Sequence, residues 1–208
     1  MRLVVDMQGA QTLSRLQGIG RFTRGLAGAL AHRAGGHEVV FACNALFPDT
    51  IADMRRLGAT TGASVRLWNG QEDAPFRSRG PLPHGEAEKS YAAFLNDLDP
   101  DAVLFPTLLG EWEDGFVCSI DGLRKGISTA AIVHDFIPLE PFCPDLTCAD
   151  DRRTYERKLA TLWRMDILLA NSEYTRKAAE RLHPGSRIVA VGADVEPCFH
   201  PMTLSSGE

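Results

Sequence analysis

The sequence lacks several features that define large protein classes. Asp and Glu (27) outnumber Lys and Arg (22), which gives a net charge of −5, so no basic field attracts nucleic acid. No stretch reaches the roughly 18 consecutive apolar residues of a membrane-spanning helix. The apolar run at the N-terminus is interrupted by Asp6 and is too short for a secretory signal. We therefore expect a cytoplasmic protein that does not bind nucleic acid.

Cysteine is scarce and irregularly spaced. An odd number without regular pairing predicts reduced thiols rather than a disulfide framework. The five cysteines stand at positions 43, 118, 143, 148 and 198. Cys143 and Cys148, with His134 upstream, have residue types that bind zinc, but their spacing differs from the common zinc patterns. We expect neither a metal nor a cofactor.

Two familiar nucleotide-binding motifs are also missing. A dinucleotide fingerprint needs Gly-x-Gly-x-x-Gly directly after the first strand. Here Gly18-Ile19-Gly20 comes well after Asp6, and the third glycine position is occupied by Thr23. Gly-Lys followed by Ser or Thr, the signature of a phosphate-binding P-loop, does not occur. No flanking pair of carboxylates indicates a glycoside hydrolase either.

What the sequence does contain is a regular alternation of short apolar runs and helical patterns. The runs mostly lack polar alternation, as is typical of parallel strands that are covered on both faces. The predicted strands are 2–6, 38–43, 64–68, 101–106, 128–134, 166–170 and 187–192, and the predicted helices are 20–33, 47–57, 85–98, 149–165 and 173–182. The pattern predicts an α/β fold with a doubly wound, mainly parallel sheet of about seven strands. Residues 70–83 and 107–127 do not resemble core.

Ligands of such sheets bind beyond the carboxyl ends of the strands, which makes the start of the first long helix a candidate site. Gly18 and Gly20 stand there, and free N–H groups with the positive end of the helix dipole favour an anion. Arg21 adds a positive charge. In the alternative interpretation the glycines only shape the turn, and Arg21 lies on a solvated helix face. A stripe at helical spacing is expected to bury against the sheet: Ile19, Phe22, Leu26 and Leu30.

Two later strands end in polar residues. His134 closes the strand at 128–134 and is followed by Asp135. His134 is a candidate for contacting substrate hydroxyls or phosphate, and a histidine that is hydrogen-bonded to backbone is the alternative. Ser172 follows the next strand, either at the ligand edge or simply as a helix cap. An acceptor-activating base is expected among Asp6, Asp135 and the acidic stretch 111–114, and the sequence does not distinguish between them.

Four motifs in this order resemble the N-terminal half of a family-four glycosyltransferase. They are GIGRFTRGLAGAL, IVHDFIPLEPF, RKLATLWRMDILLANSEYTRKAA and IVAVGADVEPCFHP. The resemblance implies a retaining enzyme of GT-B fold that transfers a hexose from a nucleotide-sugar donor. It assigns residues 1–201 to the Rossmann-like, acceptor-side domain and 202–208 to the start of a linker or tail. The donor-binding C-terminal domain is then absent from this chain, which alone is expected to be inactive.

The resemblance also implies roles for individual residues. Gly18 and Gly20 would lie near the donor diphosphate and the acceptor, and His134 would touch the donor sugar. Arg21, Asp135 and Ser172 are carried over as further binding residues. One departure is Gly192-Ala193-Asp194, where the family more often has Asn-Gly-Val-Asp.

The implied partners are a nucleotide sugar, a saccharide or lipid-linked saccharide acceptor, and the absent domain. We expect mannose as the donor sugar, although no particular residue specifies it. Peripheral contact with the inner face of the plasma membrane through the helix at 150–165 competes with packing of that helix on the sheet. The rival functions are a non-catalytic sugar-nucleotide-binding or signalling domain and a GT-B epimerase. If the glycines form a ligand loop, we expect that loop to be partly open and Gly20→Val to leave folding intact.

Overall fold

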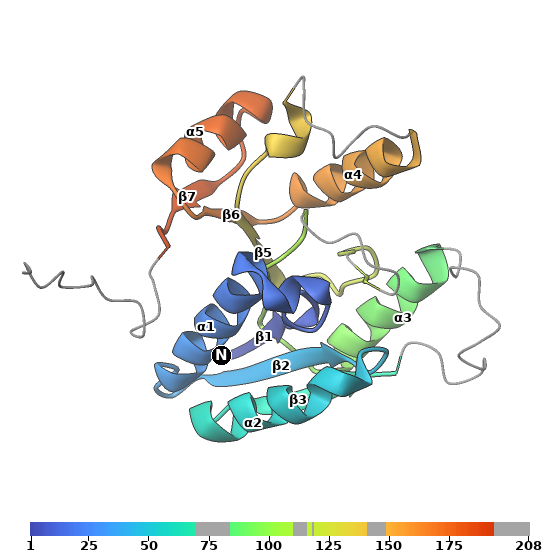
Figure 1. The fold of residues 1–208 in the computed structure, drawn as a ribbon, viewed down its shortest axis with the longest axis vertical. Helices are drawn as coiled ribbons and strands as arrows, with labels where there is room; N and C mark the ends of the chain where they lie inside the picture. Colours follow the sequence, from blue (N-terminus) through green and yellow to red (C-terminus); the bar gives the residue numbers. More distant parts are fainter. Residues whose placement is uncertain (70–83, 110–115, 118, 141–148, 194–208) are drawn as a thin grey trace, which may run out of the picture.

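A computed structural model describes residues 1–69, 84–109, 116–117, 119–140 and 149–193. Its centre is a seven-stranded sheet with the order β3-β2-β1-β4-β5-β6-β7, in which every neighbouring pair is parallel (Figure 1). The strands are β1 Arg2–Asp6, β2 Glu38–Asn44, β3 Ser64–Trp68, β4 Ala102–Phe105, β5 Ser128–Val133, β6 Ile167–Ala170 and β7 Ile188–Ala190. The predicted fold class, a doubly wound Rossmann-like α/β sheet, is confirmed.

Helices cover both faces of the sheet. The α-helices are α1 Gly18–His32, α2 Ile51–Thr61, α3 His84–Asp97, α4 Ala149–Leu162 and α5 Glu173–Leu182. Side chains alternate along a strand, so neighbouring residues enter different layers. Val5 and Phe41 pack in one core with α1 and α2. Val4 and Val103 pack in the other, with α3, α4 and α5.

The packing corrects the expected stripe of α1. Its buried residues are small or polar: Gly20, Thr23, Ala27 and Ala31. The predicted apolar residues of the stripe, such as Phe22 and Leu26, are only partly buried beside them. Periodicity identifies the side of the helix that faces the sheet, whereas the line of closest approach is occupied by residues small enough to fit there.

Two further expectations are wrong in part. The helix expected at 47–57 is shifted toward the C-terminus. Pro48–Thr50 form the 3-10 turn η3 instead, and the α-helix α2 runs from Ile51 to Thr61, where Gly62 in a left-handed conformation ends it. The segment 107–127 does contribute to the core, because Leu108 and Val117 are buried there. Residues 70–83 and the acidic residues 111–114 lie outside the described residues.

Helix α4 packs on the sheet. Tyr155 and Leu162 are fully buried, and Leu159 and Trp163 pack against the same core. This arrangement favours the packed-helix alternative over a membrane-facing α4. In the part of the chain that the structure describes, no helix combines the length and apolar character needed to cross a bilayer.

The strand order reverses direction between β1 and β4. In doubly wound sheets this switch point opens a crevice at the carboxyl ends of the strands, where ligands bind. The segments that follow β1, β4, β5 and β6 therefore surround the candidate site.

Candidate functional site

The start of α1 is a helix terminus that its own residues leave without a side-chain cap. Gly18 and Gly20 belong to the first turn of α1 rather than to a loop before it, which corrects the expected open loop. The N-cap residue is Gln17, whose side chain makes no capping hydrogen bond within the described structure, and the first turn contains no acid. The positive end of the dipole is therefore uncompensated by local carboxylates. Arg21 is exposed in the same turn.

The two glycines have different reasons to be glycine. A Cβ at Gly20 would lie 2.3 Å from Cα of Arg15 and 2.4 Å from the carbonyl oxygen of Ser14. These are backbone atoms, so Gly20 is required for close packing, and the expectation that Gly20→Val spares folding is wrong. A Cβ at Gly18 meets no atom of the described structure within 4 Å. Gly18 is therefore the glycine that leaves space at the helix terminus.

Helix α1 is fixed to the end of β4 at the switch point. The hydroxyls of Thr23 and Thr107 are 2.9 Å apart in a buried hydrogen bond. A Cβ at Gly9, in the 3-10 turn η1 Gln8–Ala10, would lie 2.3 Å from Oγ1 of Thr107. Three segments from distant parts of the chain thus meet in van der Waals contact, which fixes the terminus of α1 relative to the sheet.

His134 follows β5 and lies against α1. Its ring contacts Phe22 edge to face, with centroids 5.0 Å apart. Nε2 lies 3.1 Å from the carbonyl oxygen of Pro106 and donates to it when it carries the proton. Burial lowers the pKa of His134 below its ordinary value, against smaller opposing effects of the Pro106 carbonyl and the Asp135 charge. In the neutral ring with Nε2 protonated, Nδ1 is a hydrogen-bond acceptor.

The end of β6 is coupled to His134 through one threonine. Oγ1 of Thr175 lies 3.0 Å from the carbonyl oxygen of His134 and 3.0 Å from Oδ1 of Asn171. Ser172 is the N-cap of α5, and its Oγ accepts the N–H of Thr175 at 3.1 Å. Ser172 therefore acts as a helix cap, as the alternative interpretation of this residue expects.

The two described candidates for a base lie in different surroundings. Asp135 is exposed beside His134, and its Oδ1 accepts the N–H of Ile137 at 2.9 Å. Asp6 is 2% exposed, with both oxygens occupied: Oδ1 accepts the N–H of Gln8, and Oδ2 accepts from Nε2 of Gln8 and the hydroxyl of Tyr91. Asp6 cannot reach an acceptor, so it is withdrawn as a candidate base.

Asp6 instead belongs to a buried polar network below the site. Gln8 also accepts from Nδ2 of Asn44 at 3.0 Å and from the N–H of Val117 at 3.1 Å. Burial raises the pKa of Asp6 to about 6, although the hydrogen bonds from Tyr91 and Gln8 oppose this shift. The network joins β1, β2, α3 and residue 117, and it thereby supports the segment that leads into α1.

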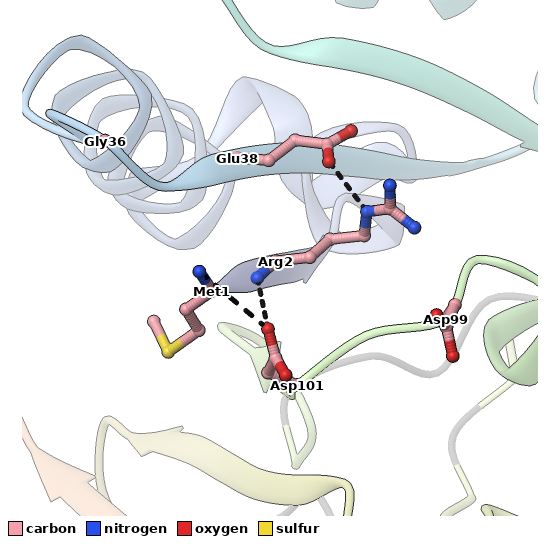
Figure 2. A pocket seen from close by; sticks show the side chains of 6 residues that line it. All are labelled: Met1, Arg2, Gly36, Glu38, Asp99 and Asp101. Carbon is pink, nitrogen blue, oxygen red and sulfur yellow. Dashed lines mark hydrogen bonds and ion pairs between the residues drawn. The ribbon is translucent and has the colours of Figure 1, made fainter.

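A separate open pocket of about 380 Å³ lies at the opposite edge of the sheet (Figure 2). Its polar groups are largely paired with each other. Nε of Arg2 donates to Glu38 at 2.8 Å, and the backbone N–H of Arg2 donates to Asp101 at 2.6 Å. These contacts tie together the amino ends of β1, β2 and the segment before β4. The pocket is therefore a structural junction, remote from the carboxyl edge.

Neither metal-binding side chains nor thiols form a second candidate site in the described residues. The described ranges contain no group of three or more His, Cys, Asp or Glu side chains arranged to hold a metal ion. Cys143 and Cys148 lie outside those ranges. Cys43 is a free, buried thiol whose pKa is raised to about 12, mainly by burial and further by the charge of Asp6.

The structure places Gly18, Arg21, His134, Asp135 and Ser172 on segments that start at the carboxyl edge. It connects α1 with His134, and His134 with the cap of α5. Sequence reasoning missed Thr107 and Thr175. Thr107 directly follows the predicted strand 101–106, so the rule that ligands bind beyond the carboxyl ends of strands could have identified it. Nothing in the sequence singles out Thr175.

Comparisons with known proteins concern the chain as a whole and its fold. No family model matches the chain. The serotype-specific mannosyltransferase WbdA of Escherichia coli is 28% identical over 194 residues, which are 88% of this chain and 23% of WbdA. MurG of Acinetobacter baumannii has a similar structure, with a TM-score of 0.50 and 17% identity over 94% of this chain and 46% of MurG. UGT89C1 of Arabidopsis thaliana, solved with UDP, also gives a TM-score of 0.50, with 14% identity over 95% of this chain and 50% of UGT89C1.

The structural likenesses show a shared fold, a Rossmann-like α/β sheet with helices on both faces. The chain spans less than a quarter of the length of the curated relative and about half of each solved structure.

Proposed function

We propose that this chain is the acceptor-side domain of a retaining, family-four glycosyltransferase of GT-B fold. Residues 1–201 form that domain, residues 202–208 begin the linker, and a donor-binding domain completes the enzyme in the full-length protein. The observation that carries the proposal is the contact of His134 with α1 at the switch point. The similarity to a mannosyltransferase along most of the chain supports the same conclusion.

In this proposal the donor diphosphate lies at the start of α1. Gly18 leaves room there, and the helix dipole together with the Arg21 guanidinium stabilises the negative charge that develops on the leaving nucleotide. The helix dipole is preorganised, since Thr23 and Thr107 fix the helix before any ligand arrives. In this proposal the second half of such a clamp is provided by the donor-binding domain.

His134 binds the donor sugar in its neutral form. Because burial lowers its pKa, the ring is uncharged at neutral pH, and Nδ1 accepts a hydrogen bond from a sugar hydroxyl while Nε2 is held by Pro106. Asp135, exposed beside it, is the proposed base for the acceptor hydroxyl, which belongs to a saccharide or a lipid-linked saccharide. GDP-mannose is the donor we propose to test first, and the location we propose is the cytoplasm.

The test is a transfer assay on the full-length protein with GDP-mannose and a panel of UDP-sugars, in which release of the nucleoside diphosphate is measured. His134→Gln is expected to lower kcat/KM about 100-fold, within the range for loss of a positioned polar group. His37→Gln is the matched control, since His37 is exposed just before β2, at the amino edge of the sheet. Equal activity of the two variants would overturn the assignment of His134, and inversion at the anomeric carbon, detected by NMR, would overturn the retaining mechanism.

A further inference from the structure

Three aromatic rings from separate segments stack behind the turn that carries His134 and Asp135. The centroids of the Phe136 and Trp163 rings are 5.6 Å apart, and the two planes differ by 21°. The centroids of the Trp163 and His183 rings are 4.9 Å apart, with the planes nearly parallel at 6°. The indole of Trp163 therefore packs on two rings at once.

The stack joins the ends of two helices to the turn after β5. Trp163 directly follows α4. His183 is the C-cap of α5, and its Nδ1 lies 2.7 Å from Oγ of Ser186. Phe136 is 8% exposed and directly precedes the 3-10 turn η4, Ile137–Leu139. Two of the rings thus belong to helix ends that pack on the sheet, and the turn contributes the third.

The position of Phe136 determines how the neighbouring carboxylate is held. Oδ1 of Asp135 accepts the N–H of Ile137 at 2.9 Å, and Phe136 is the residue between them. This hydrogen bond keeps its geometry only while the backbone of Phe136 stays in place, and the buried ring fixes that backbone. His134, by contrast, has contacts of its own with the segments after β4 and β6.

We propose that Trp163 is a positioning residue for Asp135 and acts through the ring of Phe136. The inference rests on the proposed function, in which Asp135 is the base for the acceptor hydroxyl. The stack holds the turn from its buried side, so the carboxylate has a fixed orientation before an acceptor binds. Without the indole, the ring of Phe136 loses its partner in the core, and the turn that orients Asp135 loosens.

Transfer kinetics of the full-length protein test this role. Trp163→Leu is expected to lower kcat about tenfold, less than the 100-fold or more that loss of a general base costs. The KM for the nucleotide sugar is expected to stay unchanged, because Trp163 does not support the donor contact of His134. Trp163→Phe keeps a ring that can stack and is expected to restore most of kcat. A Trp163→Leu enzyme with the kcat of the wild type would overturn the proposal.

Phe94→Leu is the matched control. Phe94 is also partly buried against the same core, and it stacks on Tyr91 of α3 with centroids 6.0 Å apart. Its replacement removes a stacked ring without touching Phe136, so kcat is expected to stay at the wild-type value. A loss of kcat equal to that of Trp163→Leu would mean that any loss of core packing slows the enzyme, and would overturn the specific role of Trp163.

A double variant shows whether Trp163 acts through Phe136. Phe136→Leu and Trp163→Leu remove the same contact, so the combination is expected to be no slower than the slower of the two single variants. Effects on kcat that multiply would show that the two rings act independently, against the proposal. Circular dichroism verifies that every variant is folded.

Amide hydrogen exchange at Ile137 tests the positioning apart from catalysis. Its N–H, which donates to Asp135, is expected to exchange about tenfold faster in Trp163→Leu and at the wild-type rate in Phe94→Leu. Unchanged exchange in a folded Trp163→Leu protein would overturn the proposal. If exchange accelerates as expected but the wild type transfers no sugar, the hold of Trp163 on the turn is supported, and the proposed function is the part that fails.

Discussion

The rings of Phe22 and His134 lie edge to face, with their centroids 5.0 Å apart. Phe22 belongs to α1 and His134 follows β5, so this contact joins the helix terminus to a neighbouring strand end at the switch point. The contact also covers the imidazole, and burial is the main reason why the pKa of His134 is low. Phe22 thereby helps to set the protonation state of the residue that we propose binds the donor sugar.

Removal of this cover is expected to raise the pKa of His134. In Phe22→Ala the ring becomes more hydrated, the charged form is penalised less, and the pKa moves up toward its ordinary value. NMR titration of the imidazole measures the shift, with His134→Gln identifying the resonance. Phe47→Ala, at another partly buried phenylalanine, is the control and is expected to leave the titration unchanged. An unshifted titration in Phe22→Ala would show that other atoms exclude water from the ring.

The two glycines of α1 are expected to respond differently to alanine. Gly20→Ala forces a methyl group against backbone atoms of Ser14 and Arg15, which costs on the order of 2 kcal/mol of the free energy of unfolding, as overpacking does elsewhere. Gly18→Ala introduces no contact within the described structure and is expected to be neutral or slightly stabilising. Urea denaturation compares the two, and equal destabilisation would contradict the packing described at Gly20.

Asp6 is expected to make stability depend on pH. Its pKa is about 6 in the folded protein against an ordinary value of 3.8, so the folded state binds its proton more tightly. The stabilisation is complete below about pH 4 and is lost as the pH rises through 6, a change on the order of 3 kcal/mol. Urea denaturation between pH 4 and 7 measures this slope, and Asp6→Asn is expected to reduce it.

Asp53→Asn, at an exposed carboxylate of α2, is the matched control and is expected to keep the wild-type slope. Tyr91→Phe supplies an independent outcome. The Tyr91 hydroxyl lowers the pKa of Asp6 by donating to the carboxylate, so its loss is expected to move the pH window upward. A downward movement would mean that the hydroxyl does not stabilise the charged form.

The sheet was predictable because each strand is a short apolar run, and all seven were identified from the sequence. The carboxyl edge follows from the alternation of strands and helices, and this rule alone makes Gly18 and His134 candidate site residues. The alternation of strands and helices and the carboxyl-edge rule both concern whole segments. They identify the edge of the sheet at which ligands bind, but not which side chains at that edge contact one another.

The remaining features depend on contacts between distant residues. The hydrogen bond between Thr23 and Thr107 joins positions 84 residues apart. The burial of Asp6 depends on Tyr91 of α3, 85 residues away. An acid at a strand end has the same local pattern whether it faces a ligand or a buried tyrosine. Only the packing separates these two cases.

The final prediction concerns the backbone of His134. Thr175 is buried, and its hydroxyl lies within hydrogen-bond distance of the His134 carbonyl oxygen. Thr175→Val keeps the shape and removes the donor, which is expected to cost about 2 kcal/mol of unfolding free energy and to shift the NMR resonances of His134. Thr161→Val is the control, since it also removes the hydroxyl of a buried threonine, one that donates to the carbonyl oxygen of Arg157 within α4, and it is expected to leave the His134 resonances in place. If Thr175→Val also leaves the His134 resonances in place, Thr175 does not position the histidine, and the two strand ends are coupled only through the sheet.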